Sequence, residues 1–372
     1  IRKDNPFPTA CALICEHPCE ARCRRNIIDD SINIRGIKRY IVDNAPSDQV
    51  PVPECAPSTG KNIAIIGGGP RGLTAAYFLQ LMGHHCTVFE EKQHLGGMLR
   101  YGIPNYRFPR ERLQEDIDAI LATGVEVKMN QNIGTEEMKE IHKFYDATYV
   151  AIGAHTDKKL GLEGEDSKNV ISAVDMLREI GDGKYPDYTG KRVVVVGGGN
   201  VAMDAARTAL RLGAEVHIVC RRSEAELPAR AEEVHHAKEE GIIFDLLTNP
   251  KEILVDENGH VKGMKVVKME LGEPDASGRR RPVEIPGSEY DMDVDTVIMS
   301  LGTSPNPLIS STTKGLEVNK RRCIIAEEET GKTSKDGVYA GGDAVTGAAT
   351  VILAMGAGKA GAKGIDEYLK NK

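Results

Sequence analysis

The sequence predicts an α/β protein with two Rossmann-like dinucleotide-binding domains, preceded by a small segment that carries four cysteines. The two domains are indicated by glycine-rich loops at residues 67–72 and 197–202, each of which stands between an apolar strand and a helix. The small segment is indicated by the even spacing of four cysteines, Cys11, Cys15, Cys19 and Cys23. Four thiolates are soft ligands, which suit an iron–sulfur cluster or structural zinc.

The length and the net charge limit the number of domains and the kind of partner that this protein can have. The chain has 372 residues, enough for two or three domains. Its 48 basic and 55 acidic residues give a formal charge of −7, which argues against nucleic acid as the main partner. We find no apolar run of the ~20 residues that a membrane span needs, and no secretion leader, so we expect a cytoplasmic protein without a membrane span. Because the chain begins at Ile1, we interpret it as a piece of a longer polypeptide.

Residues 1–46 form the cysteine-bearing segment, with one amphipathic stretch at residues 32–42. The proline-rich residues 47–60 are expected to be an extended linker. In a cytoplasmic protein thiols stay reduced, so we expect metal binding rather than disulfides from the clustered cysteines. The single cysteines are expected to be buried packing residues; they are Cys55, Cys86, Cys220 and Cys323.

The first glycine loop lies in a βαβ unit with a strand at residues 61–66, a helix at 73–82 and a second strand at 86–89. Gly67 permits the tight turn, Gly69 lets backbone approach a pyrophosphate, and Gly72 lets helix and strand pack closely. Glu90 ends the second strand, near the position where an acid binds ribose hydroxyls.

The second loop repeats the pattern with strands at residues 192–196 and 215–219 and a helix at 202–212, but Ala202 takes the third glycine position. Arg221 and Arg222 stand where the first unit has its acid. An arginine can bind a 2′-phosphate that an acid would repel, so this site is predicted to prefer NADP over NAD. Arg230 is a candidate for the same phosphate. The alternative is that the arginine pair is solvated surface.

Two later regions complete the prediction. Alternating apolar residues at 253–298, Val294 to Met299 included, suggest a β-meander, with an exposed hairpin at residues 272–282. Near the end, Asp343 follows Gly341 and Gly342, and a helix of small residues follows at 350–361. The acid could reach a cofactor hydroxyl, and the helix N-terminus could stabilise negative charge on a reduced ring. The alternative is a packing turn. A metal site beside two nucleotide sites is typical of an electron-transfer flavoprotein.

Together these motifs resemble the NADPH/FAD/iron–sulfur oxidoreductases of the glutamate synthase small (beta) subunit family. The same module is seen in the N-terminal half of dihydropyrimidine dehydrogenase and in the large subunit of the bifurcating ferredoxin:NADP transhydrogenase. The resemblance covers almost the whole chain, and its landmarks, besides the glycine loops, are residues 5–8, 32–36, 96–104, 149–153, 221–230, 301–303 and 341–343.

The resemblance implies a two-dinucleotide-binding-domain flavoprotein in which an NADP domain (residues 167–292) is inserted into a FAD domain (residues 61–166 and 293–372). Residues implied to bind FAD are Gly67, Gly69, Pro70, Gly72, Glu90, Gly97, Met98, Leu99, Gly342, Asp343, Thr350 and Val351. Residues implied to bind NADP(H) are Gly197, Gly199, Asn200, Val201, Arg221, Arg222 and Arg230. Gly153 and Gly302 are expected to line the cofactor sites. Hydride transfer would proceed by stacking of the two cofactors, without a catalytic side chain.

The cysteine spacing would line one face of a helix, but Pro18 forbids a continuous helix, so we expect a loop that wraps a metal. The resemblance favours one [4Fe–4S] cluster bound by Cys11, Cys15, Cys19 and Cys23, with zinc or no metal as alternatives. Relatives carry two clusters, but here Lys38 stands in place of an acidic or amide ligand. A second cluster would therefore need ligands upstream of this chain.

The sequence thus predicts an enzyme, an NAD(P)H-dependent flavin oxidoreductase subunit. It would move electrons between NADP(H), FAD and the [4Fe–4S] cluster, to or from other redox subunits or domains of a larger complex, with ferredoxin as one candidate. One alternative is a flavin-based electron-bifurcating transhydrogenase subunit. Others are a stand-alone NADPH oxidoreductase with structural zinc and a non-catalytic assembly subunit.

Overall fold

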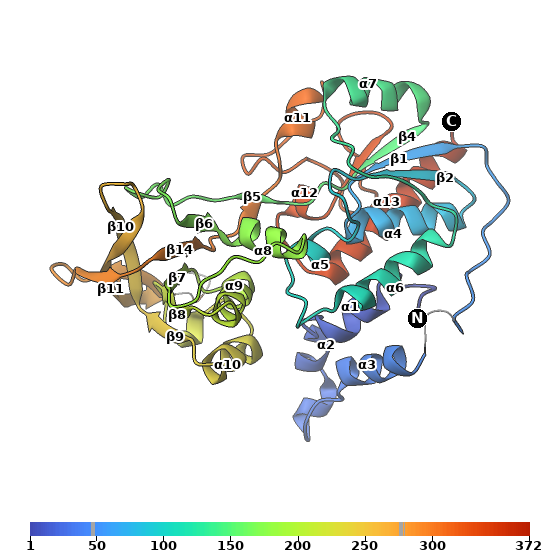
Figure 1. Cartoon of the computed structure of the whole chain (residues 1–372). Coiled ribbons are helices and arrows are strands. Elements are labelled where there is room, and N and C mark those ends of the chain that lie inside the picture. The colour runs from blue at the N-terminus through green and yellow to red at the C-terminus, as the bar shows by residue number, and fades with distance from the viewer. Residues whose placement is uncertain (46–48, 275–277, 279) are drawn as a thin grey trace. The chain divides into compact units, whose positions relative to one another are not determined.

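The computed structural model describes residues 1–45, 49–274, 278 and 280–372, and its chain forms two compact units (Figure 1). One unit comprises residues 1–156 and 303–372, and the other comprises residues 157–302. The second unit is therefore inserted within the sequence of the first. It begins at residue 157 and ends at residue 302, ten residues before and ten residues after the expected NADP domain of residues 167–292. The expected start of the linker and part of the expected hairpin, residues 275–277 and 279, lie outside the described residues.

The first unit is built on a five-stranded parallel sheet. Its strands in spatial order are β16 (Val338–Ala340), β4 (Ala147–Val150), β1 (Asn62–Ile66), β2 (His85–Phe89) and β3 (Glu126–Lys128). Parallel strands are buried on both faces, which explains why β1 and β4 read as apolar runs rather than alternating patterns. Three long helices pack on this unit: α4 (Pro70–Leu81), α6 (Arg110–Leu121) and α13 (Val351–Lys370).

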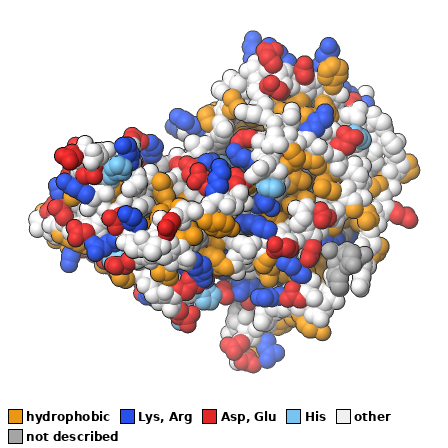
Figure 2. Space-filling view, viewed as in Figure 1, with side chains coloured by type: hydrophobic (Ala, Val, Ile, Leu, Met, Phe, Trp, Pro, Cys, Tyr) orange, Lys and Arg blue, Asp and Glu red, His pale blue; other side chains and the backbone are white. Residues whose placement is uncertain are grey.

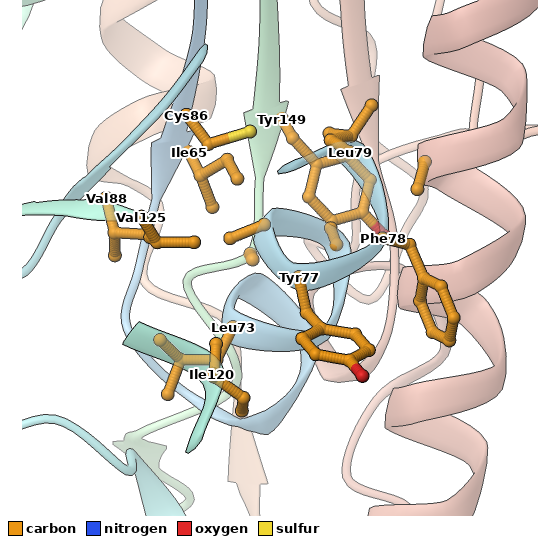
Figure 3. Close-up of a cluster of buried hydrophobic side chains, with 14 of the residues drawn as sticks. Ile65, Leu73, Tyr77, Phe78, Leu79, Cys86, Val88, Ile120, Val125 and Tyr149 are labelled. Atoms are coloured by element: carbon orange, nitrogen blue, oxygen red, sulfur yellow. The ribbon is translucent and has the colours of Figure 1, made fainter. Parts of the chain in front are cut away.

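A large hydrophobic cluster of this unit lies between the sheet and α4. Ile65, Cys86 and Val88 extend from the strands toward Leu73 and Tyr77 of the helix (Figure 3). All five side chains are almost completely buried. The expected burial of Cys86 is therefore confirmed, as it is for Cys220 and Cys323, whereas Cys55 is exposed.

The cysteine-bearing segment is mostly helical, which corrects the expected loop. It contains α1 (Pro8–Leu13), α2 (Pro18–Ala21), a short 3₁₀ helix η1 (Arg24–Ile27) and α3 (Ile34–Asn44). The predicted break is present: His17 adopts a left-handed backbone conformation (φ +41°), and Pro18 opens the next helix. Phe7 and Cys11 belong to the hydrophobic core of the first unit, so the segment is anchored rather than separate.

A carboxylate from α6 holds the start of α1. Asp116 is fully buried and accepts hydrogen bonds from the Thr9 N–H (3.1 Å), the Thr9 hydroxyl (2.9 Å) and the Ala10 N–H (3.3 Å). Arg2 pairs with the same carboxylate at 3.1 Å. Asp116 therefore caps a helix that lies far from it in sequence and ties the cysteine segment to the first unit.

The burial of Asp116 is expected to make the stability of the fold depend on pH. Burial raises the pKa of Asp116 from 3.8 to about 6. The folded state then binds the proton more tightly than the unfolded chain. The stability gained by protonation of Asp116 is therefore complete below about pH 4 and is lost as the pH rises through about 6. Over that window we expect the free energy of unfolding of the wild type to fall by about 3 kcal/mol relative to Asp116→Asn, measured by urea unfolding at several pH values. The same pH dependence in both proteins would contradict this role.

The second unit repeats the architecture with a parallel sheet in the order β6 (Val170–Ser172), β14 (Thr296–Met299), β7 (Arg192–Val196), β8 (Glu215–Cys220) and β9 (Ile243–Leu246). Its helices are α8 (Ala173–Gly181), α9 (Asn200–Arg211), η3 (Glu224–Glu226) and α10 (Ala231–Glu239). The meander is antiparallel and comprises β10 (Thr248–Val255), β11 (Val261–Pro274), β12 (Arg280–Glu284) and β13 (Tyr290–Asp293).

One part of the meander prediction is wrong. Residues 296–299 form β14, which pairs in parallel with β6 and β7 instead of joining the meander. Its four residues are all buried, as expected for a central parallel strand, and a short apolar run does not by itself reveal its partners. The remaining elements are α5 (Met98–Tyr101), α7 (Thr135–Phe144), β5 (Thr156–Asp157), β15 (Thr303–Ser304), α11 (Leu308–Thr312) and α12 (Asp343–Thr346). Among the described helices none is both long and apolar enough to cross a membrane.

Candidate functional site

The first glycine loop is shaped by two positions that admit no side chain. Gly67 has φ +109°, and a Cβ there would lie 2.5 Å from the Ala151 carbonyl oxygen. A Cβ on Gly72 would lie 2.0 Å from the Gly67 carbonyl oxygen, so the backbone of helix α4 packs directly against the backbone of the loop. At Gly69, in contrast, the nearest atom to an added Cβ is 3.7 Å away, on Gly97. Gly69 thus leaves space beside the N-terminus of α4.

The turn that precedes α5 rests on this loop. The Gly96 N–H donates to the Gly68 carbonyl at 2.9 Å. Gly97 has φ +51°, and a Cβ there would lie 2.8 Å from the Gly69 Cα. Met98 and Leu99, the expected flavin-lining residues, begin α5 directly after this contact. The structure therefore brings the 67–72 and 96–99 segments together.

Glu90 is hydrogen-bonded to the backbone of the first glycine loop. One carboxylate oxygen accepts from the Gly68 N–H at 2.7 Å, and the other accepts from the Lys92 N–H at 2.8 Å. Burial raises the pKa of Glu90, although both backbone contacts oppose that shift. The acid is therefore held at the carboxyl end of β2, where it could reach a ribose.

The Gly341–Asp343 turn follows β16 at the same edge of the sheet as the first loop. Gly342 has φ +58° and precedes α12, whose first residue is Asp343. Burial raises the pKa of Asp343 to about 6, and its carboxylate accepts from the Ala349 N–H at 3.2 Å. Thr350 caps α13 through its hydroxyl, which accepts from the Leu353 N–H at 3.5 Å, and Val351 is the first residue of that helix.

In the second glycine loop, as in the first, one glycine is required by close packing and another leaves open space. Gly197 has φ +143°, and a Cβ there would lie 2.3 Å from the Ser300 carbonyl oxygen, whereas nothing lies within 4 Å of a Cβ on Gly199. The next segment folds back on the loop, because the Ala229 N–H donates to the Gly198 carbonyl at 3.0 Å. The Arg230 N–H donates to the side-chain oxygen of Asn200, also at 3.0 Å.

The three candidate arginines differ in their surroundings. Arg221, exposed, and Arg222, half-buried, follow β8 directly. Among the described residues neither has an ion-pair partner. The Arg230 guanidinium is paired with Glu233 at 2.6 Å, so its use in phosphate binding would require that pair to be shared. Of the remaining candidates, Val201 lies in the first turn of α9, Gly153 has φ +67°, and Gly302 has φ +88°.

The four cysteines lie on consecutive short elements. Cys11 is buried in α1, Cys15 is buried after it, Cys19 is exposed in α2, and Cys23 precedes η1. Burial raises the pKa of Cys11 to about 11, while the Ile32 N–H and other backbone donors lower that of Cys23. Within the described residues no group of three or more His, Cys, Asp or Glu side chains is assembled around a metal position.

These residues fit the expected cofactors in their chemistry. The N-cap of helix α4 is Gly69, which has no side chain to cap the helix. This leaves first-turn N–H groups and the positive end of the helix dipole for a phosphate. Helix α9 begins in the same way at Gly199. The cysteine segment supplies four soft ligands, the donor set that iron–sulfur clusters take.

Two site features were missed by the sequence reasoning. Arg71 is almost fully buried inside the first glycine loop, with its Nε 2.7 Å from the hydroxyl of Tyr149. The sequence did offer one signal, because Arg71 is a charged residue within a glycine loop whose neighbouring residues are expected to be buried. The backbone contact of Ala229 with Gly198 was also not anticipated, although Arg230 was a candidate for this site, because the contact depends on how the chain folds between β8 and α10.

Two units, in each of which a glycine loop leads into a helix without a side-chain cap, define a class, the two-domain dinucleotide-binding proteins. The chain matches the family model described as pyridine nucleotide-disulphide oxidoreductase over residues 61–358. Residues 1–50 match a second family model, dihydropyrimidine dehydrogenase domain II, 4Fe-4S cluster. The chain therefore belongs to the pyridine nucleotide-disulphide oxidoreductase family and carries an N-terminal domain of the 4Fe-4S type.

Similar proteins agree with this membership. The chain is 43% identical to the NADP(+)-dependent formate dehydrogenase subunit beta of Moorella thermoacetica, over 100% of this chain and 56% of that protein. It is 35% identical to the glutamate synthase [NADPH] small chain of Escherichia coli, over 98% of this chain and 81% of that protein. A solved structure of Mycobacterium tuberculosis FprA in complex with NADPH shares the fold, with TM-score 0.73, 20% identity and 85% coverage of each chain.

These findings confirm the resemblance to the glutamate synthase small chain, the fold class and the enzyme class. Its family membership and its N-terminal domain imply FAD, NADP(H) and a 4Fe–4S cluster as the cofactors. The chain spans just over half of the length of the formate dehydrogenase subunit.

Proposed function

We propose that this chain is the nucleotide-oxidising or nucleotide-reducing part of a larger cytoplasmic redox complex, in which it passes electrons between NADP(H) and a partner subunit. FAD, when bound, supplies the conversion between a two-electron hydride and single electrons. The residues of the first unit would orient the flavin through the 67–72, 96–99 and 341–343 segments. Those of the second unit would hold NADP(H) at Gly197, Gly199 and the arginines that follow β8.

The observation that carries this proposal is the pair of glycine loops with different residues at the ends of their second strands. In the first unit Glu90 is held on the loop by the Gly68 N–H. In the second unit Arg221 and Arg222 occupy the corresponding place, without an ion pair to any described residue. A cationic site of this kind favours the 2′-phosphate that distinguishes NADP from NAD.

A partner subunit is supported by the surface of the cysteine-bearing segment. Helix α3 buries none of its residues. The side chains of Ile27, Ile28 and Tyr40 are 81%, 89% and 70% exposed. Figure 2 shows apolar side chains on the face of the molecule seen in Figure 1, among charged groups of both signs. Exposed apolar surface beside the cysteines suits a docking partner, for which another redox subunit or a ferredoxin is the candidate.

The relatives also support a partner, because their names refer to different overall reactions, those of formate dehydrogenase and glutamate synthase. The part they share with this chain is then the nucleotide-linked module, and the final acceptor or donor would lie on another chain or domain.

The test is an anaerobic visible titration of the purified protein with NADPH and, separately, with NADH. We expect loss of flavin absorbance together with loss of the broad cluster absorbance, at lower concentrations of NADPH than of NADH. Loss of flavin absorbance with no iron present would support the zinc alternative, and no reduction by either nucleotide would contradict the proposed function.

Replacement of one expected cluster ligand is predicted to separate the two redox centres. Cys19→Ser should remove the iron, because serine is a poor ligand for the soft cluster, and should leave FAD bound, because Cys19 is exposed on α2. Iron analysis and the flavin spectrum measure the two effects. Cys55→Ser is the matched control, an exposed cysteine outside the segment, and should retain both centres. Retention of iron in Cys19→Ser would remove Cys19 from the ligand set.

A further inference from the structure

Arg71 is a buried positive charge inside the first glycine loop. It is the second residue of α4 and is only 6% exposed. Its Nε donates a hydrogen bond of 2.7 Å to the hydroxyl of Tyr149, a fully buried residue of β4. That hydroxyl in turn donates to the Ala357 carbonyl of α13 at 2.9 Å. The guanidinium is therefore anchored at one end by a fixed chain of hydrogen bonds.

The other end of the guanidinium lies on the turn that follows β16. A Cβ on Gly341 would lie 2.1 Å from Nη2 of Arg71, and a Cβ on Gly342 would lie 2.4 Å from Nη1. Glycine at both positions leaves room for Arg71 in this conformation of its side chain. Three segments that the chain brings together from far apart, the start of α4, β4 and residues 341–342, thus form the pocket of Arg71.

Within the described residues, Nη1 of Arg71 is buried without a hydrogen-bond partner. Asp343 interacts with Arg71 through its charge, without a hydrogen bond between the two described side chains. Burial lowers the pKa of Arg71. A buried guanidinium nitrogen without a hydrogen-bond acceptor is costly in free energy. Arg207 shows the usual arrangement in the second unit: it is 7% exposed, and all three of its nitrogens donate to Glu233 or Glu240.

We propose that Arg71 is an anion-binding residue of the FAD site, whose Nη1 pairs with the pyrophosphate of the dinucleotide. The inference rests on the proposed placement of FAD in the first unit. The pyrophosphate carries the negative charge of oxidised FAD, and the uncapped N-terminus of α4, of which Arg71 is part, is where a phosphate binds. A guanidinium is suited to that group, because its planar fork matches phosphate oxygens.

The experiment is a titration of FAD-free protein with FAD, followed by flavin fluorescence, for the wild type, Arg71→Met and Arg71→Lys. We expect the dissociation constant to rise about 10- to 100-fold in Arg71→Met and less in Arg71→Lys, which keeps the charge but loses the fork. Added salt should weaken FAD binding less in Arg71→Met than in the wild type. Arg112→Met is the control, since it removes an equal charge from α6, where Arg112 pairs with Asp43, and it should bind FAD as the wild type does.

Competition with ADP and with adenosine identifies the group that Arg71 binds. The wild type should prefer ADP, and Arg71→Met should lose most of that preference. Unchanged FAD affinity in Arg71→Met, or an equal loss for ADP and adenosine, would overturn the inference. If Arg71→Met does not fold, Arg71→Lys carries the test, because wild-type FAD affinity in that variant would also overturn the inference. Failure of the wild type to bind FAD at all would instead overturn the proposed function.

Discussion

Gly199→Ala is expected to abolish most of the NADP(H) binding while leaving the fold intact. Its backbone (φ −91°, ψ 177°) is open to alanine, and no atom lies within 4 Å of the added Cβ. The methyl group would instead occupy the space through which the loop approaches the pyrophosphate. Overpacking of this kind costs about 1–3 kcal/mol, so we expect the dissociation constant for NADPH to rise about 5- to 150-fold.

The measurement is NADPH binding by isothermal calorimetry, with thermal unfolding measured alongside. Gly69→Ala is the matched variant in the first unit, where the nearest atom to the added Cβ is 3.7 Å away. It should weaken FAD binding by a similar factor and leave thermal stability unchanged. Gly72→Ala should behave differently and lower stability, because its Cβ would lie 2.0 Å from the Gly67 carbonyl oxygen. Unaltered NADPH binding in Gly199→Ala would place the nucleotide elsewhere.

Replacement of both Arg221 and Arg222 by alanine is expected to change the choice of nucleotide. The two side chains follow β8 and make no ion pair with a described residue, so their removal should not disturb the fold. A hydrogen bond to a charged group contributes about 1.5–3 kcal/mol, so loss of two such contacts should weaken NADPH binding at least about 100-fold. NADH lacks the 2′-phosphate, and its binding should remain unchanged.

The comparison requires dissociation constants for both nucleotides with the wild type and the double variant. Arg211→Ala is a control on the same unit, because Arg211 pairs with Glu240. It should lose neither nucleotide. An equal loss of NADPH and NADH affinity in the double variant would show that the arginines support the loop rather than read the phosphate.

Local patterns allowed much of the fold to be predicted. The strands around both glycine loops and the start of each following helix lie within a few residues of their predicted positions, because strand, loop and helix are adjacent in sequence. Assignment of β14 to the meander was wrong, since a strand of four residues can join either sheet and its neighbours are chosen by packing. The cysteine segment was expected to be a loop, yet helices form on both sides of the break at His17 and Pro18.

By itself, the sequence determined the kinds of site in this protein: two dinucleotide loops, the arginine pair after the second, and four soft ligands near the start. Each follows from residues close together in the chain, whose local geometry and chemistry are set by residue type. Only the tertiary structure decided that Asp116 caps α1 and that Arg71 lies between Tyr149 and Gly341. These contacts join distant segments, so they exist only once parallel strands bring their carboxyl ends to one edge of the sheet and helices pack over it.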